Sequence, residues 1–308
     1  GLSLLVGVGL PAAWELELLP GVRPGSVEEE FPQAGYAVRP PAPWVREEPD
    51  GAPSWRSTTG TSRLTTTGWT EEHAPPSRDE VKAVWVADLQ RSGAVVATRP
   101  MALAPKMPPN LAGCFSLEMD LVVDGALLRA VNVGCIRGTH VTTIQFVHPL
   151  AEWRGQRRVR DGVLATVRLT EPEFLRVARK GATEPQDRPA QLVLAAALAR
   201  LGQREEAEAI LAELEVAVPD APEILYWRLW VELHLGDGRA LAADREQMAE
   251  RMLLLEPEAL PFVALAFDVL LHRGHLARAR EILGHMRSRW PDRSLTKDRI
   301  ARLAAAGG

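Results

Sequence analysis

The two cysteines of the chain, Cys114 and Cys135, are the residues whose type and spacing most directly allow chemistry. They flank two strand-like runs joined by Asp124-Gly125, a dipeptide typical of a two-residue type I′ hairpin. In that hairpin, facing residue numbers add up to 249, so Cys114 faces Cys135. The predicted position is a non-hydrogen-bonded pair with Cα atoms roughly 4.5 Å apart, which is within the range of a disulfide.

The oxidation state of this pair stays open at the level of sequence. A disulfide indicates an oxidising compartment such as the periplasm, whereas two reduced thiols that merely face each other suit the cytoplasm. A redox-active role needs a lowered thiol pKa, and neither His nor Lys adjoins either cysteine in the sequence. The compartment is therefore undecided, with the cytoplasm preferred unless the pair is oxidised.

The histidines form two groups that merit comparison with metal sites. His140 and His148 share one side of a predicted strand but are about 27 Å apart at the usual rise, so they cannot chelate one ion directly. His272, His275 and His285 lie close in sequence, but no cysteine accompanies them and they share only one nearby carboxylate. We interpret them as surface or groove histidines and expect no metal.

Motifs of common catalytic sites are missing from the sequence. It has no GxSxG elbow, no phosphate-binding loop and no HExxH pair. Gly7, Gly9 and Ala12 superficially match a dinucleotide fingerprint, but Pro11 interrupts the match and no acidic ribose partner follows. We therefore expect no catalytic residue and no cofactor.

Length and composition favour two globular domains of ordinary size. The chain has 308 residues, of which 46% are hydrophobic, and a net charge of −4. Neither half is basic enough to indicate a nucleic-acid partner, and the abundance of Arg over Lys indicates a GC-rich bacterial genome. A basic cluster over 154–160 is interpreted as a solvated loop between strands, the alternative being a contact with phosphate or an acidic protein surface. The apolar residues 1–14 are too short for a membrane span and are either a trimmed signal or a buried strand.

Residues 1–184 are expected to form an α+β sandwich. A helix is predicted over 75–90, with Ser77 as its N-cap and Glu80 completing a capping box. Consecutive antiparallel strands and a few helices indicate this fold class. The odd-numbered face of the first hairpin strand is expected to be buried, and the cysteine face to be more polar. The other predicted segments are a strand entering a proline turn over 31–44, a loop over 47–67, strands over 140–148 and 163–169, and a closing helix over 171–180.

The phrase GYAVRPPAPW, the hairpin and the terminal helix together resemble the PsbP/Mog1-like family over roughly residues 30–180. This resemblance rests on the order of elements and not on a diagnostic motif. It implies a central antiparallel α/β/α sandwich, with helices covering both sides of the sheet. It also implies a binding or chaperone-like module more often than an enzyme.

The last third of the chain contains a repeated spacing. Its two copies are Gly202, Ala207 and Pro219, then Gly274, Ala279 and Pro291. Gly permits positive φ at the end of a first helix, a small Ala lets the second helix approach closely, and Pro ends that second helix. The pattern therefore predicts helix-turn-helix units that stack on one another.

This spacing resembles the tetratricopeptide (TPR) repeat, a helix-turn-helix of 34 residues. Gly202 to Gly236 spans 34 residues, but Gly236 to Gly274 spans 38, so four extra residues lie between Gly236 and Pro257. They belong either to a longer turn between helices or to an additional helical turn. Residues 185–308 are thus expected to form an all-α, TPR-like domain of about three units, followed by a closing helix after Pro291.

The resemblance to that repeat places one face of each first helix on an inner groove. Tyr226 and Trp230 are spaced i, i+4 there, and aromatic anchors often dominate peptide recognition. The alternative is that both pack between repeats, because Trp227 and Leu229 compete for the inward direction. The matching positions, predicted to bind a partner, are Arg200, Tyr226, Trp230, His234, Asp268 and His272.

The two resemblances together predict a non-catalytic bacterial scaffold or adaptor within a larger complex. Its groove is expected to hold a peptide or helix of a partner protein, and a narrower version is a chaperone for secreted or membrane-bound cargo. The alternative is an enzyme or small-molecule-binding protein with a pocket near Trp69, His73 and Trp85. A thermal-shift screen in which a metabolite stabilises residues 1–184 alone would favour that alternative.

Overall fold

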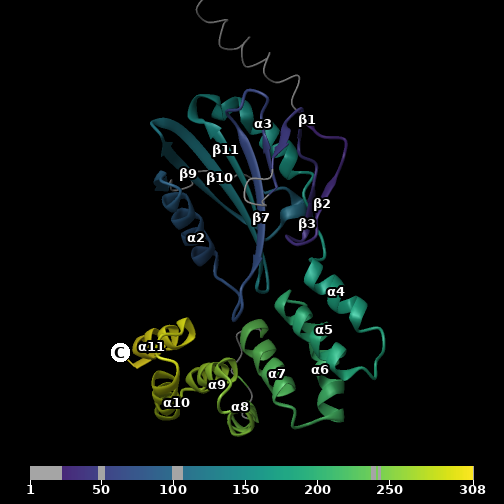
Figure 1. Ribbon diagram of the computed structural model, residues 1–308, viewed down its shortest axis with the longest axis vertical. Helices are drawn as coiled ribbons and strands as arrows, with labels where there is room; N and C mark the ends of the chain where they lie inside the picture. Colours follow the sequence, from purple (N-terminus) through teal and green to yellow (C-terminus); the bar gives the residue numbers. More distant parts are fainter. Residues whose placement is uncertain (1–22, 48–52, 99–106, 237–240, 242–243, 308) are drawn as a thin grey trace, which may run out of the picture. The chain divides into compact units, whose positions relative to one another are not determined.

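The computed structural model describes residues 23–47, 53–98, 107–236, 241 and 244–307. The apolar stretch 1–14, including its glycines, lies outside the described residues. The chain forms two compact units, one of residues 1–71 with 76–176 and one of residues 72–75 with 177–308. The expected boundary after residue 184 lies eight residues beyond this division. Antiparallel strands dominate the first unit and helices the second, so the fold is α+β as predicted (Figure 1).

The first unit is built on a seven-stranded antiparallel sheet in the order β5-β6-β7-β11-β10-β9-β8. Two smaller sheets, β1-β4 and β12-β3-β2, accompany it. The strands are β1 (Arg23–Pro24), β2 (Glu29–Phe31), β3 (Tyr36–Val38), β4 (Pro41–Ala42), β5 (Val45–Glu47), β6 (Ser54–Arg56), β7 (Arg63–Thr70), β8 (Val95–Thr98), β9 (Phe115–Val123), β10 (Ala126–Arg137), β11 (His140–Pro149) and β12 (Arg168–Leu169).

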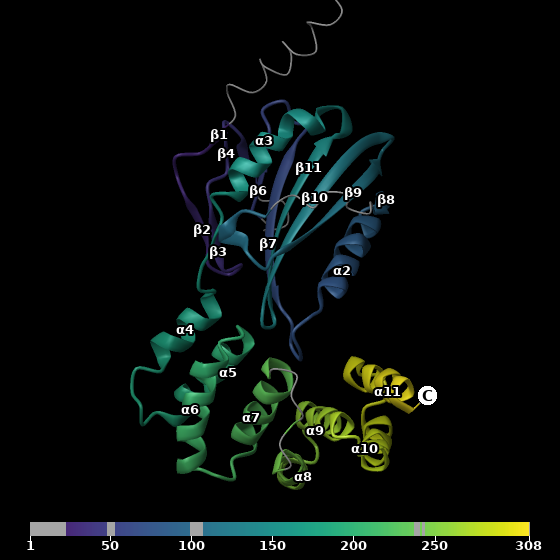
Figure 2. The same cartoon turned by 180° about the vertical axis from the view of Figure 1, so that it is seen from behind.

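Helices cover both faces of the large sheet, which is the predicted sandwich (Figure 2). Helix α2 (Arg78–Arg91) packs Val81 and Trp85 against Phe115 and Val141. On the other face, α3 (Trp153–Leu164) joins the largest hydrophobic core of the unit. Two short 3₁₀ helices, Pro109–Leu111 and Leu150–Glu152, also belong to this unit, and α4 (Glu173–Gly181) spans the division between the units.

The hairpin and the N-terminus of α2 form as their local sequences require. Val123 pairs with Ala126 and Phe115 with Gly134, which is the predicted register. Cys114 and Cys135 are joined in a disulfide with their Cα atoms 4.4 Å apart. The side chains of Ser77 and Glu80 form both hydrogen bonds of the capping box.

The expectation of a more polar cysteine face holds only for β9. On the neighbouring β10, Cys135 belongs to the large core beneath α3 together with Val131 and Val133. The odd-numbered side chains Phe115, Met119 and Leu121 of β9 are buried on the opposite face, as predicted.

The predicted loop over 154–160 and most of the strand over 163–169 are wrong. Residues 153–164 form α3, and only Arg168–Leu169 are in a strand. The physical reason is a helical spacing of apolar side chains, with Val159, Val163 and Leu164 buried. The glycines and arginines of this segment obscured that spacing. Arg160 is buried as well, with its guanidinium 4.7 Å from the centre of the Trp153 ring.

Two other predictions for the first unit need correction. The segment 47–67, expected to be a loop, contains β6 and the start of β7, because its run of threonines suits a half-buried sheet surface. The segment 31–44 contains β3, β4 and the end of β2 instead of one strand. The predicted strand 140–148 and the closing helix 171–180 correspond to β11 and α4.

The second unit is a run of paired helices. First helices α5, α7 and α9 contact one another in series, and each also contacts the helix that follows it. None of the described helices is long and apolar enough to cross a membrane. The helices are α5 (Arg188–Arg200), α6 (Arg204–Ala217), α7 (Pro222–Leu235), α8 (Asp244–Leu255), α9 (Leu260–His272), α10 (Leu276–Arg289) and α11 (Ser294–Gly307).

The repeated Gly and Ala take the conformations expected of them. Gly202 and Gly274 have φ of 78° and 80°, and Ala207 and Ala279 are fully buried. Among the first helices, α7 has 14 residues and α5 and α9 have 13 each. Among the second helices, α8 is described over 12 residues and α6 and α10 over 14 each. Most of the segment between α7 and α8, residues 237–240 and 242–243, lies outside the described residues, so the choice between a longer turn and an additional helical turn stays open.

Candidate functional site

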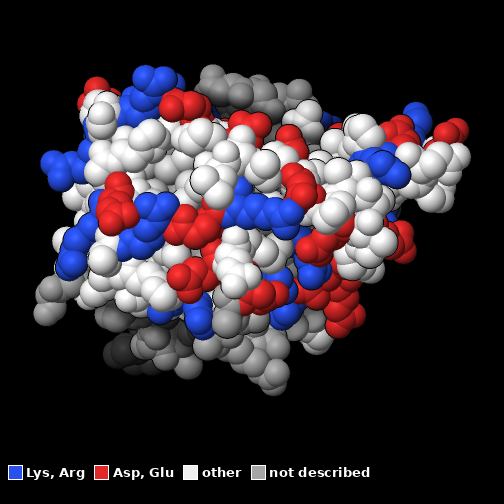
Figure 3. Space-filling model, turned by 90° about the horizontal axis from the view of Figure 1, so that it is seen from below, with Lys and Arg blue, Asp and Glu red and all other residues white. Residues whose placement is uncertain are grey.

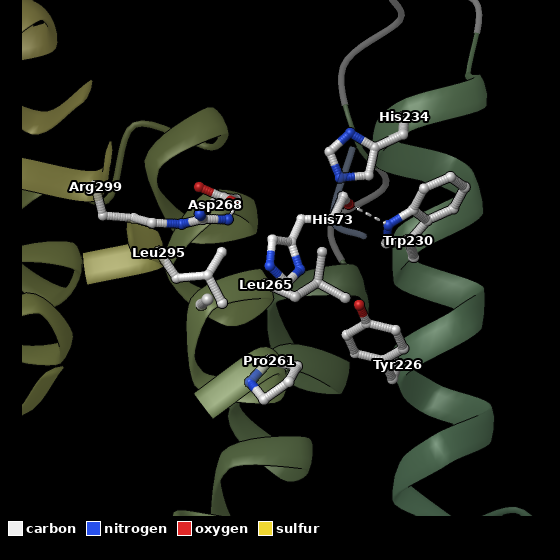
Figure 4. Close-up of a pocket in the computed structure, with 10 residues that line it drawn as sticks. His73, Tyr226, Trp230, His234, Pro261, Leu265, Asp268, Leu295 and Arg299 are labelled. Carbon is white, nitrogen blue, oxygen red and sulfur yellow. Dashed lines mark hydrogen bonds and ion pairs between the residues drawn. The ribbon is translucent and has the colours of Figure 1, made fainter. Parts of the chain in front are cut away.

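The candidate site lies between α7 and α9 in the helical unit. Tyr226, Trp230 and His234 follow one another at intervals of four on α7, so they share a face of that helix. Asp268 of α9 lies across from them (Figure 4). The structure thus brings together four of the six predicted residues. The other side chains that line this pocket are His73, Pro261, Ala264, Leu265, Leu295 and Arg299.

Trp230 combines a packing role with a polar contact. Its side chain is 1% exposed and lies beside Trp227 and His234, with ring centres 5.6 and 4.9 Å away. Its indole Nε1 donates a hydrogen bond of 2.7 Å to the backbone oxygen of His73. Trp230 is therefore a buried residue that also makes a polar contact within the helical unit, and its role in binding a partner stays a prediction.

The segment 72–75 belongs to the helical unit although it follows β7 and precedes α2 in sequence. Figure 4 shows the His73 ring between α7 and α9, with Tyr226 and Trp230 on one side and Asp268 on the other. Only about 10 Å³ of empty space remains in the pocket, which is the room of a single water at most. His73 thus occupies the groove, whereas the sequence suggested it for a pocket of the first domain.

A buried ion pair forms the far wall of the pocket. Asp268 accepts a hydrogen bond from Arg299 of α11, and Arg302 lies 3.3 Å from its other oxygen. Burial raises the pKa of Asp268, and the two guanidinium groups oppose that rise. The Nε of Arg299 is buried without a hydrogen-bond partner among the described residues. The sequence did not identify Arg299 as a site residue, because it lies on the closing helix outside the repeated pattern. Its only local signal is the i, i+3 spacing from Arg302, which puts both side chains on one face of that helix.

The polar rings on α7 are held uncharged. Burial, followed by the positive charges of Arg302 and Arg299, lowers the pKa of His234 to about 4. Burial likewise raises the pKa of Tyr226, whose ring packs 5.1 Å from that of Phe262. At neutral pH the α7 side of the pocket therefore presents neutral, partly aromatic groups, and the charges lie on α9 and α11.

The remaining two predicted residues lie outside this pocket. The guanidinium of Arg200 is 5.5 Å from the centre of the Trp227 ring, which places it on the neighbouring face of α7. His272 is exposed at the end of α9. Both stay predictions as partner-binding residues.

The histidines considered as metal ligands have other neighbours. His275 lies 2.8 Å from Glu246, and the ring of His285 approaches the backbone oxygen of Pro257 at 3.3 Å. Across the described part of the chain, no three His, Cys, Asp or Glu side chains are grouped as a metal site requires.

On the face drawn in Figure 3, acidic and basic side chains are interspersed.

Trp69 and Trp85 belong to the sheet unit and His73 to the helical unit, so the pocket expected near these three residues stays a prediction. Trp85 lines a cavity of about 260 Å³ in the sheet unit, together with residues of β7, β10 and β11. Trp69 is not among its lining residues, and His73 belongs to the helical unit.

No protein-family model and no curated protein matches the chain. Among solved structures, it is similar to the cyanobacterial PsbP protein CyanoP from Synechocystis sp. PCC 6803. That similarity has 13% identity and a TM-score of 0.36, and it covers 46% of this chain and 91% of CyanoP. A protein from Bacteroides thetaiotaomicron VPI-5482 is similar at 11% identity and a TM-score of 0.32, covering 76% of this chain and 80% of its own.

Proposed function

We propose that the chain is a non-catalytic adaptor whose helical unit binds an extended segment of a partner protein between α7 and α9. The observation that carries this proposal is the hydrogen bond from Trp230 to the backbone oxygen of His73, with the His73 ring seated in the pocket. A main-chain hydrogen bond combined with a side-chain pocket is the usual basis of peptide recognition.

The surroundings of His73 favour binding of a segment over catalysis. Trp230 and Asp268 are held by packing and by ion pairs, so the groove is ordered before a ligand arrives. The buried Nε of Arg299 is a donor available to a carbonyl or carboxylate oxygen of a bound segment. Nothing in this set supplies a nucleophile with an adjacent general base.

Residues 72–75 act in this proposal as a resident ligand. A partner segment has to displace them, so the affinity of the intact chain is lower than that of a chain with an empty groove. The residues Glu72-His73-Ala74-Pro75 also indicate the preferred partner chemistry, which is an extended segment with a planar ring followed by a small residue and proline. Proline limits the flexibility of such a segment and so lowers the entropic cost of binding.

The test uses the full chain with residues 72–75 replaced by Gly-Ser-Gly-Ser, and a labelled peptide of sequence TEEHAPPSR, which reproduces residues 70–78. Fluorescence anisotropy measures binding. We expect the peptide to bind the replaced chain at least tenfold more tightly than the native chain, because the resident segment competes in the latter. The matched peptide TEEAAPPSR, which lacks the ring, is expected to bind at least tenfold more weakly.

Trp230→Phe in the replaced chain tests the hydrogen bond itself, because it keeps an aromatic ring and removes the indole donor. We expect an at least fivefold weaker affinity for TEEHAPPSR, since a hydrogen bond of this kind contributes about 1 kcal/mol or more when its acceptor is otherwise left unpaired. Equal binding of both peptides, or no binding to the replaced chain, contradicts the proposal. A photocrosslinker at Tyr226, compared with one at the exposed Leu254, then identifies partners in native lysate.

A further inference from the structure

The sheet unit contains a cavity that the adaptor function does not use. It has a volume of about 260 Å³ and is lined by side chains of α2, β7, β10 and β11. This volume lies just below the range typical of pockets for drug-sized ligands, so the cavity suits a smaller molecule. All its lining residues belong to one compact unit.

The floor of the cavity is a cluster of polar side chains on the sheet face that α2 covers. Gln145 of β11 faces Thr65 of β7 on one side and Asn132 of β10 on the other. In the adjacent row, Thr143 faces Thr67. Side chains in one such row point to the same face of the sheet, so these hydroxyl and amide groups converge on one space.

Asn132 is the least expected member of this patch. It lies between the buried core residues Val131 and Val133 and is itself only 1% exposed. Its Oδ1 atom is buried and has no hydrogen-bond partner among the described residues. Buried side-chain oxygens are nearly always hydrogen-bonded, so an unpaired one beside a cavity points to a ligand that supplies the missing donor.

Trp85 forms an ordered wall next to this patch. Its Nε1 donates a hydrogen bond of 3.2 Å to the hydroxyl of Thr143, and its ring stacks on Phe115. A Cβ atom at Gly134 would lie 2.8 Å from atoms of the Trp85 ring, so glycine is required for this close approach. Because the hydroxyl of Thr143 accepts from Trp85, its own proton remains available to a ligand.

The lining groups define the ligand as neutral and rich in hydroxyls. The lining contains no Lys or Arg, and its one carboxylate, Asp88, is exposed and paired with Arg91. Threonine hydroxyls and carboxamides each donate and accept hydrogen bonds, which matches the donor and acceptor pattern of polyols. We infer that this cavity binds a neutral polyhydroxylated molecule of monosaccharide size, either free or at the end of a glycan.

The experiment follows the indole N–H resonance of Trp85 by NMR in the full chain, assigned with a Trp85→Phe variant. The probes are glucose, N-acetylglucosamine and myo-inositol, each at millimolar concentration. Maltotriose and chitotriose distinguish a glycan end from a free sugar. We expect at least one of these five probes to shift the Trp85 resonance in a saturable manner.

Asn132→Leu tests the proposed contact, because leucine has nearly the same volume and leaves no unpaired amide. We expect this variant to bind the responding probe at least tenfold more weakly while its melting temperature stays the same or rises. Gln145→Leu, at a half-buried position of the same row, is expected to weaken binding as well and serves if the first variant misfolds. Gln90→Ala, an exposed residue of α2 outside the lining, is the control with unchanged binding.

Two outcomes overturn the inference. One is that none of the five probes shifts the Trp85 resonance. The other is that Asn132→Leu and Gln145→Leu bind the responding probe as tightly as the native chain does. Neither outcome bears on peptide binding by the helical unit, which is measured with a different probe.

Discussion

At the scale of single residues, His148 is an ionisable group held where its charge is disfavoured. It is fully buried among aromatic side chains, with ring centres of Trp44 and Trp153 at 6.3 and 6.0 Å. Neither ring nitrogen has a hydrogen-bond partner among the described residues. Burial, and to a smaller extent the charge of Arg160, lowers the pKa of His148 to about 3.

This lowered pKa predicts acid sensitivity of the sheet unit. The unfolded chain takes up a proton at His148 near pH 6.5, whereas the folded chain does not until the pH approaches 3, so stability is lost as the pH falls between these values. Between pH 7 and pH 5, the free energy of unfolding of the native chain is expected to fall by about 2 kcal/mol more than that of the His148→Leu variant. Urea unfolding at both pH values measures the difference. Equal losses in the two proteins contradict this account.

Gly134 gives a second prediction at this scale. Its replacement by Ala places a Cβ against the rings of Trp85 and Phe115, and such overpacking costs about 1–3 kcal/mol. Gly155→Ala on α3 is the matched control, because nothing lies within 4 Å of its Cβ position, and it should stabilise the helix. Thermal melting of both variants tests the pair. An unchanged melting temperature of Gly134→Ala would show that Trp85 moves freely and is not an ordered wall of the cavity.

At the scale of elements, the α5–α6 and α9–α10 turns depend on a left-handed backbone conformation. Gly274 joins α9 and α10 with φ of 80°, and Gly202 does the same between α5 and α6 with φ of 78°. L-residues other than glycine are strained there. These two glycines therefore set the angle at which each helix returns along its predecessor.

Gly274→Ala is expected to destabilise the helical unit by about 1–2 kcal/mol, since the new side chain is forced into the left-handed region. Gly284→Ala lies inside α10 with no atom within 4 Å of its Cβ position, and it should stabilise the unit by up to about 1 kcal/mol. Chemical denaturation followed by helical circular dichroism measures both. Equal effects of the two substitutions argue against a conformational role of Gly274.

At the scale of the whole molecule, the disulfide is confined to one of the two units. Cys114 and Cys135 are 21 residues apart in the sheet unit, and the chain has no other cysteine. A cross-link of this length stabilises a fold by roughly 3 kcal/mol, chiefly by restricting the unfolded chain. The helical unit derives no direct stability from it.

Reduction is therefore expected to affect the two units unequally. Hydrogen exchange with and without a thiol reductant should show faster exchange in the strands β9–β11 and unchanged exchange in α9 and α10. The double variant Cys114→Ser, Cys135→Ser controls for effects of the reductant itself. A comparable loss of protection in α9 and α10 would mean that the two units unfold together.

Short-range stereochemistry explains what the sequence predicted well. The Asp124-Gly125 turn allows one hairpin register, which placed the two cysteines opposite each other. The capping box set the start of α2, and the Gly-Ala-Pro intervals identified the paired helices. Each of these signals acts over a few residues, so the rest of the fold does not have to be known.

Long-range packing decided the parts that the sequence did not predict. Residues 153–164 form α3 because the helical spacing of their buried side chains matches the sheet face beneath them. The site depends on packing even more, since His73 reaches Trp230 across 157 residues and Arg299 reaches Asp268 across 31. By itself the sequence determined which helices pair and which residues of α7 share a face. Only the tertiary structure decided what that face holds, because burial of distant segments depends on the whole fold.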